Sequence, residues 1–101
     1  MMFRSRKLLD AARGQDCTVN LPYICNHNSE TVVAAHSNWM EHGRAMSMKA
    51  HDIFIADCCS DCHRELDQGN TLSEDEKKHY WTRGHIKTLL RRLEQGILKV
   101  K

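Results

Sequence analysis

The spacing of the cysteines constrains the fold of this chain more than any other feature of its sequence. Cys59 and Cys62 form a C-x-x-C motif, a spacing at which two thiolates can occupy adjacent corners of a tetrahedral Zn²⁺ site. Cys17 and Cys25 form a second pair, which a turn at Pro22 can close. We expect the two pairs to form one structural zinc site. A chain of 101 residues buries only about 60–68% of its unfolded surface, so such a site would contribute directly to folding.

Three other interpretations of the cysteines stay open at this point. The C-x-x-C pair could be a redox dithiol, although no βαβ pattern surrounds it. The cysteines could be free thiols buried in a small core, as unreactive cysteines commonly are. Cys58 could replace Cys59 as a ligand, although three residues separate it from Cys62 where a C-x-x-C motif has two.

The length and composition are those of a single domain over residues 1–101. No apolar run approaches the roughly 18–20 residues of a transmembrane helix. Residues 1–7 are basic but no apolar stretch follows them, so we expect no secretory signal and no membrane partner. We therefore expect a cytoplasmic protein. In that reducing compartment clustered cysteines more often bind metal or react than form disulfides.

The net charge of +2 conceals an uneven distribution of charge along the chain. Residues 1–13 contain four basic and one acidic residue, residues 14–76 three basic and eleven acidic, and residues 77–101 eight basic and one acidic. The acidic middle also contains all five cysteines and five of the seven histidines, which is typical of a cation site. The basic ends are typical of a surface for a polyanion such as DNA, or of a helix with a solvated basic face. The candidate DNA-binding residues are Arg4, Arg6, Lys7, Arg13, Lys77, Lys78, Arg83, Lys87, Arg91 and Arg92.

Short elements are expected before residue 70. The best strand candidate ends on His36 and is rich in β-branched residues, whereas Gly14 is a typical helix C-terminal residue. Periodicity does not separate a helical turn from a strand over residues 51–57. The expected elements, in chain order, are a helix over 5–13, a strand over 17–19, a strand over 31–36, a loop over 37–48, a helical turn or short buried strand over 51–57, and a helix over 58–68.

A long helix is expected over residues 74–95. Ser73 and Glu76 have the spacing of a capping box, and Gly96 is the expected C-terminal stop. Gly84 is the one residue that argues against an unbroken helix. We therefore expect an α+β fold with a long, amphipathic and basic C-terminal helix. The apolar stripe expected to face the core consists of Ile86, Leu89, Leu90, Leu93 and Ile97.

Two histidines have positions that suggest chemistry. His63 directly follows the C-x-x-C motif, and Asp67 lies one helical turn later on the same face. A histidine and a carboxylate so placed can hold a divalent cation, although such pairs are more often surface contacts. His36, at the end of a strand, could act as a general base near neutral pH, although a histidine there is usually structural.

The order of these residues resembles that of the HNH (ββα-metal) endonucleases, in which two zinc-binding pairs often flank a strand histidine. More closely, it resembles the YbcO-type family of phages and prophages, whose members are named as nucleases. The resemblance covers roughly residues 5–69, whereas the C-terminal helix matches only in character. It is carried by Ala11 to Cys17, Cys25-Asn26, Glu30-Thr31, Ala35-His36 and Cys59 to His63.

The resemblance implies a fold and a role for each matching residue. The fold is a small zinc-stabilised ββα-metal domain, HNH-like, with its core over about residues 15–69. His36 matches the catalytic base, His63 a ligand of the catalytic divalent ion, and Asp67 stands where a second helix ligand is expected. Asp52 is nearest the place of the residue that positions the base, which is usually Asn. Ala35 departs from the pattern, since many HNH enzymes have an Asp or His ligand there.

The leading functional hypothesis is a metal-dependent DNA endonuclease with a structural Zn²⁺ and with Mg²⁺ or another divalent cation at the catalytic site. By family analogy it would act in phage or prophage DNA recombination or processing, in the host bacterial cytoplasm, without sequence specificity or on particular DNA structures. The alternative is a zinc-stabilised DNA-binding module without catalysis. A third interpretation is a protein-interaction adaptor that dimerises through the helix at 74–95.

Overall fold

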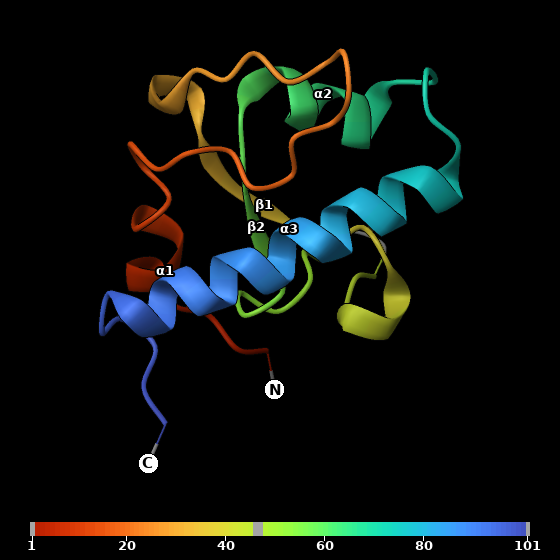
Figure 1. Cartoon of the computed structure of the whole chain (residues 1–101). Helices are drawn as coiled ribbons and strands as arrows, with labels where there is room; N and C mark the ends of the chain where they lie inside the picture. The colour runs from red at the N-terminus through yellow and green to blue at the C-terminus, as the bar shows by residue number, and fades with distance from the viewer. Residues whose placement is uncertain (1, 46–47, 101) are drawn as a thin grey trace.

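The computed structural model describes residues 2–45 and 48–100 of the chain. They form an α+β fold in which a two-stranded antiparallel sheet packs against a long C-terminal helix (Figure 1). None of the helices in these ranges is long and apolar enough to cross a membrane. The elements, in chain order, are α1 (Arg6–Asp10), η1 (Ser29–Thr31), β1 (Val33–His36), η2 (Met40–His42), β2 (Ile55–Cys58), α2 (Ser60–Gln68) and α3 (Glu74–Glu94).

The two strands pair from Val33 opposite Cys58 to His36 opposite Ile55. Residues 51–57, for which two interpretations were open, therefore contain the start of a strand, as β2 begins at Ile55. The strand expected over residues 17–19 is absent among the described residues. Thr18 makes one backbone bond to β2, from its N–H to the carbonyl of Asp57 at 2.8 Å, but no ladder continues from it.

The C-terminal helix begins where the sequence predicts. Ser73 accepts a hydrogen bond from the Glu76 N–H, and the Glu76 side chain accepts one from the Ser73 N–H, so the capping box is complete. Gly84 does not interrupt α3. A Cβ at this position would lie only 3.0 Å from the Cα of Val19, so glycine lets the helix pack closely against the loop before Leu21.

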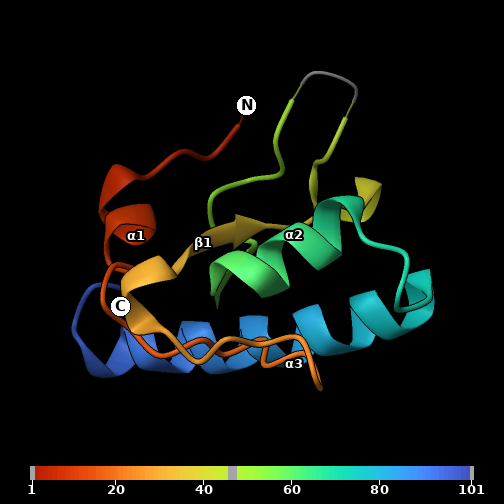
Figure 2. The same ribbon diagram turned by 90° about the horizontal axis from the view of Figure 1, so that it is seen from above.

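The predicted core face of α3 is wrong. Ile86, Leu90 and Leu93 are 54%, 55% and 39% exposed, respectively. The buried face lies on the opposite side of the helix and includes Trp81 and Thr88. Figure 2 shows α3 running along one side of the molecule, with β1 and α2 on the other. The helix therefore turns Trp81 and its small and polar residues toward the sheet and its aliphatic stripe away from it.

A buried acidic residue explains this orientation. Asp57, in β2, is fully buried, and its carboxylate oxygens accept hydrogen bonds from Arg92 at 2.5 and 3.0 Å and from Arg91 at 2.8 Å. Thr88 Oγ1 accepts a hydrogen bond from the Asp57 N–H at 2.9 Å. A buried carboxylate without these partners would be strongly destabilising, so the face of α3 that carries them must point inward.

The same packing corrects two of the predicted DNA-binding residues. Arg92 is fully buried against Asp57, and Lys77 is buried with its Nζ donating to the carbonyl of Gly69 at 2.6 Å. Neither side chain is available to a phosphate group, so neither belongs to a DNA-binding surface. Arg91 is mostly buried and also bonds the carbonyl of Asp16 at 2.9 Å.

Two histidines outside the predicted site belong to an aromatic cluster. His85 stacks on Trp81 with ring centroids 4.9 Å apart, and His42 stacks on Phe54 at 4.5 Å. The Nδ1 atom of His85 lies 2.7 Å from the carbonyl of Ile55, and burial lowers its pKa. Both histidines therefore contribute to packing between α3 and the loop before β2.

Candidate functional site

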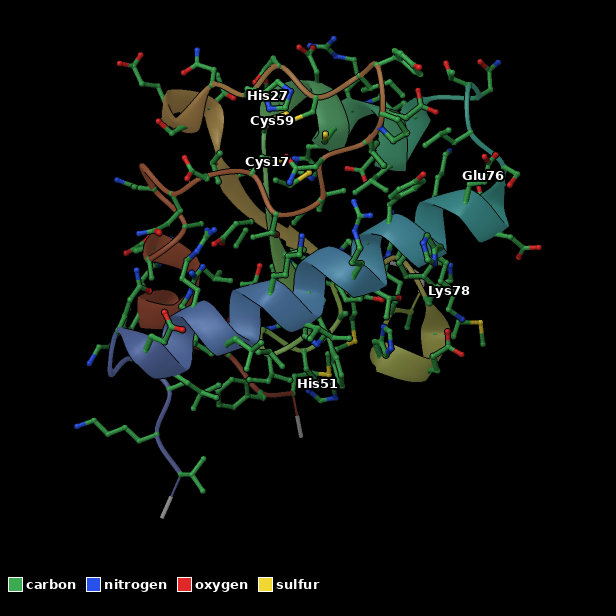
Figure 3. All side chains as sticks on the ribbon, in the orientation of Figure 1. Cys17, His27, His51, Cys59, Glu76 and Lys78 are labelled. Atoms are coloured by element: carbon green, nitrogen blue, oxygen red, sulfur yellow. The ribbon has the colours of Figure 1, made fainter. Side chains whose placement is uncertain are left out.

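Four cysteines converge at one end of the molecule. The thiol sulfurs of Cys17, Cys25, Cys59 and Cys62 all lie within 4.8 Å of one another, and those of Cys25 and Cys59 are 3.8 Å apart. Two thiolates bound to one tetrahedral Zn²⁺ at about 2.3 Å are separated by about 3.8 Å, so the cluster fits such an ion. Figure 3 shows Cys17 and Cys59 close together, with His27 beside them. These four residues could therefore hold a metal ion such as zinc.

The backbone around the cluster is arranged for thiolates. Four N–H groups donate to its sulfurs at 3.3–3.5 Å: those of Asn20 and Cys59 to Cys17, that of Leu21 to Cys62, and that of Cys62 to Cys59. Cys59 is also the N-cap of α2, so the positive end of this helix faces the sulfurs. The arrangement stabilises negative charge on sulfur.

The loop that carries Cys25 has an unusual backbone. Asn20, Tyr23 and His27 have positive φ angles of 46°, 62° and 54°, a conformation that is costly for residues other than glycine. These turns fold residues 20–27 back on themselves. They bring Cys25 next to Cys17, although seven residues separate the two along the chain.

Cys59 and not Cys58 completes the cluster. Cys58 is a fully buried residue of β2, and hydrogen bonding to Cys17 raises its pKa.

Burial raises the pKa of Cys25 to about 11. Thiols packed this closely do not all ionise by themselves at neutral pH, whereas a bound divalent cation would offset their mutual repulsion.

The predicted base pairs with a carboxylate. His36, the last residue of β1, has its Nε2 atom 2.7 Å from Oδ1 of Asp52. Burial alone would raise the pKa of Asp52, but hydrogen bonds from His36, the Ser5 N–H and Arg4 outweigh it and hold that pKa below its usual range. Asp52 is therefore a carboxylate and accepts the bond, so Nε2 of His36 carries the hydrogen. In the neutral form of the ring, the other nitrogen, Nδ1, carries no hydrogen.

The N-terminal segment holds this pair in place. Arg4 donates to Asp52 Oδ1 at 3.1 Å and to the carbonyls of Ala50 at 2.5 Å and Lys49 at 2.9 Å. The Ser5 N–H donates to Asp52 Oδ2 at 2.7 Å. Arg4, predicted to bind DNA, thus has its hydrogen bonds within the protein, and its contacts orient Asp52.

The second predicted pair lies on α2. His63 Nε2 and Asp67 Oδ2 are 3.2 Å apart, and both side chains are partly exposed. Their hydrogen bond raises the pKa of His63 and lowers that of Asp67, in each case against the opposing effect of burial. Two adjacent ligands of a six-coordinate cation at about 2.1 Å are separated by about 3.0 Å, so this pair also fits a divalent ion.

The two pairs face one cleft. A hollow of about 580 Å³ is lined by His36, His63 and Asp67, among others. A second hollow of about 600 Å³ is lined by Asp52 and again by His36. The two hollows also share Leu9, Met48 and Lys49, so they are neighbours at the end of β1, and together they are called the groove below.

Three residues of the groove were missed by the sequence analysis. Asn38 donates through Nδ2 to Asp67 Oδ1 at 3.0 Å and so orients that carboxylate. Arg44 and Lys49 also line the groove. One signal could have found the last two: the acidic middle of the chain contains only three basic residues, and these are two of them.

Some of the predicted DNA-binding residues line the groove, and others lie away from it. Arg4 and Arg6 line the second hollow, whereas no residue of α3 lines either part of the groove. Lys78 is paired with Glu41, and the guanidinium of Arg83 lies 4.9 Å above the ring of Tyr80. Lys7, Arg13 and Lys87 are exposed.

Comparison with known proteins identifies the family. Residues 6–97 match the family described as "Putative nuclease YbcO". The chain belongs to the YbcO family. It is 32% identical over 93 residues to "Putative nuclease YbcO" of Escherichia coli (strain K12), a match that covers 91% of this chain and 96% of that protein. "Putative nuclease ybcO" of Enterobacteria phage 82 matches to the same extent.

A solved structure shares the fold. The protein described as "a putative bacteriophage protein from Escherichia coli str. K-12 substr. MG1655" superposes with a TM-score of 0.70 at 30% sequence identity. The alignment covers 87% of this chain and 98% of that one. The two curated relatives are named as nucleases. The groove that contains His36 and His63 is therefore the candidate site for such an activity.

Proposed function

We propose that this YbcO-family protein is a metal-dependent DNA endonuclease of the HNH (ββα-metal) type. One observation carries the proposal: His36 on β1 and the pair His63 and Asp67 on α2, distant in sequence, line the same groove. The strand–strand–helix order of β1, β2 and α2 and the nuclease names of the relatives support it. Ala35 and Asp52 depart from the usual HNH pattern, so catalytic activity itself must be tested.

His36 is the general base of the proposed reaction. Asp52 fixes its ring through the bond to Nε2, which leaves Nδ1 to take a proton from water. The water oxygen then attacks phosphorus in line, and the bond from phosphorus to the 3′ oxygen breaks. Asp52 also stabilises the imidazolium that forms, as a carboxylate partner does for other catalytic histidines.

His63 and Asp67 are the proposed ligands of the catalytic cation, Mg²⁺ or another divalent ion. When bound, the cation would stabilise negative charge on the phosphoryl oxygens and on the leaving 3′ oxygen. Asn38 donates a hydrogen bond to Oδ1 of Asp67, and the other oxygen of this carboxylate, Oδ2, lies next to His63. The partial exposure of both side chains leaves room for water and a phosphate group.

Zn²⁺ at the four cysteines is proposed to be structural. Cys62 is followed directly by His63, so an ion at the cluster would fix the first turn of α2 and, through it, the position of His63. A site with four protein ligands has no open position for substrate. Its contribution is therefore to folding and to the orientation of α2.

DNA is proposed to lie along the groove. Arg6, Arg44 and Lys49 line it and would neutralise phosphates on either side of the scissile bond. Such contacts give affinity without sequence preference and a strong dependence on salt. By analogy with the relative from a phage, we place the activity in phage or prophage DNA recombination or processing in the bacterial cytoplasm.

Cleavage of supercoiled plasmid and of branched DNA in Mg²⁺, Mn²⁺ or Ni²⁺ tests the proposal. We expect nicking by the zinc-loaded protein and a loss of about 10²–10⁴-fold in rate for His36→Ala, as for removal of a general base. His79→Ala is the matched control, because His79 is exposed on α3 outside the groove. Salt-sensitive DNA binding without nicking in any of these metals would favour the non-catalytic DNA-binding module.

A further inference from the structure

The outward face of α3 has the pattern of a helix-pairing seam. Ile86, Leu90 and Leu93 follow one another at spacings of four and three residues, and α3 ends one residue later at Glu94. This is the spacing of the apolar positions of a coiled coil, which place one apolar row along a helix. All three are 39–55% exposed, and the buried face of α3 lies on the opposite side. The row is therefore apolar surface that the described part of the chain does not cover.

We propose that this seam pairs with the same seam of a second copy of the chain, with the two α3 helices antiparallel and crossing near Leu90. The charges beside the seam favour a second copy of the chain as the partner. Glu94 is the only acidic residue between positions 77 and 101, and it is exposed, as is Lys87. In an antiparallel pair centred on Leu90, Glu94 of one copy lies opposite Lys87 of the other. The offset between them is about 1.5 Å, one residue along the helix.

The same two residues cannot pair within one chain. They are seven residues apart on α3, about 10.5 Å along its axis, which is beyond the reach of neighbouring side chains on a helix. A parallel pair in register would instead place Lys87 beside Thr82 and Glu94 beside Leu89 of the other copy, so neither charge would meet an opposite one. The two-fold antiparallel pair makes the contact twice, as a closed dimer requires.

The location of the seam is compatible with a working site in each copy. No residue of α3 lines the groove that contains His36 and His63. Pairing through the outward face of α3 therefore leaves both grooves open. The dimer would bring two grooves together on one particle, and its existence does not depend on whether the groove cleaves DNA.

Sedimentation or light scattering at rising protein concentration tests the dimer. We expect the mass of the zinc-loaded wild-type protein to rise from 11.7 kDa toward about twice that value. Leu90→Glu places a charge in the seam, and we expect dimerisation to weaken about 30-fold or more. Met40→Glu is the matched control, because Met40 is 83% exposed but lies on η2, and it should dimerise as the wild type does.

A charge exchange distinguishes the second copy from other occupants. Glu94→Lys alone should weaken dimerisation about 3- to 10-fold, because two lysines then face each other twice. The double variant Lys87→Glu with Glu94→Lys should recover the wild-type association. Circular dichroism and zinc content verify that each variant is folded. A monomeric wild type at every concentration, or a change of mass only with DNA or lipid vesicles, would overturn the proposal, and a double variant as weak as Glu94→Lys would overturn the antiparallel register.

Discussion

The Nε2 atom of His36 lies 2.7 Å from the Oδ1 atom of Asp52, sixteen residues later in the chain. This bond orients the His36 ring at the end of β1, and it depends on the Arg4 and Ser5 contacts that hold Asp52 from its other side. In the proposed HNH-type mechanism, Asp52 stands where HNH enzymes usually have a neutral amide. The proposal therefore predicts that the negative charge of Asp52, which it shares with Arg4, contributes to the reaction.

Replacement of Asp52 tests how much its negative charge contributes to the rate of nicking. We expect Asp52→Ala to lower the rate of plasmid nicking about 10²-fold, because the His36 ring loses both its orientation and its counter-charge. Asp52→Asn should lose less, since its amide oxygen can accept the same bond from Nε2. Single-turnover nicking rates of the two variants check this. Equal rates for Asp52→Ala and the wild type would remove Asp52 from the mechanism.

The pair of His63 and Asp67 predicts how cation binding depends on pH. Hydrogen bonding to Asp67 raises the pKa of His63, so protons compete with a cation already above pH 6.5, the usual pKa of histidine. Cation affinity should therefore fall as the pH falls through this raised pKa. The ion pair itself stabilises the metal-free fold below about pH 6.5, and this contribution is lost as the pH rises through the folded-state value.

Histidine titration by NMR on the protein without the catalytic cation checks the pKa of His63. In Asp67→Asn the carboxylate is gone, and the pKa of His63 should fall toward or below its usual value, because burial then acts alone. A pKa of His63 that is unchanged by Asp67→Asn would contradict the geometry of the pair.

The cysteine cluster predicts one tightly bound zinc ion per chain. Cys25→Ser and Cys59→Ser should each lose the metal and much of the folded structure, because zinc binding in a domain of this size is coupled to folding. Cys58→Ala is the matched control: Cys58 neighbours the cluster but is outside it, so this variant should retain zinc. Elemental analysis and circular dichroism measure both effects. Loss of zinc from Cys58→Ala with retention in Cys59→Ser would reverse the ligand assignment.

The buried ion pair of Asp57 and Arg92 predicts a large effect on stability. Arg92→Met leaves the buried carboxylate short of a partner and should lower the free energy of unfolding by about 3–5 kcal/mol. Lys7→Met removes the same charge from an exposed position on α1 and should change it by about 0.5 kcal/mol or less. Urea unfolding of the zinc-loaded proteins compares them. Similar midpoints for the two variants would mean that Asp57 does not determine the orientation of α3.

Several features of the fold were predictable because local chemistry determines them. The Ser73 capping box starts α3 and the C-x-x-C motif starts α2. The strand expected over residues 31–36 forms as β1, but it begins at Val33, because Thr31 belongs to η1. The convergence of Cys17 and Cys25 with the C-x-x-C pair was also predicted, since two pairs with ligand spacing can share one tetrahedral site.

The orientation of α3 was not predictable from periodicity. The aliphatic stripe at Ile86 and Leu90 has the strongest apolar pattern in the helix, yet the buried side is the one that satisfies Asp57. Whether a carboxylate is buried depends on tertiary structure, and periodicity carries no information about it. Asn38 was missed for a similar reason, because a loop has no period that shows which of its residues reach the site.

The central claim is that His36 and His63 act in one catalytic centre, and a double-variant comparison of nicking rates tests it most directly. Residues that act as a unit have non-additive effects on rate. We predict that His36→Ala and His63→Ala each abolish most of the nicking activity, and that the double variant is no slower than the worse single variant. Wild-type rates in both single variants, with zinc content and fold intact, would contradict the account.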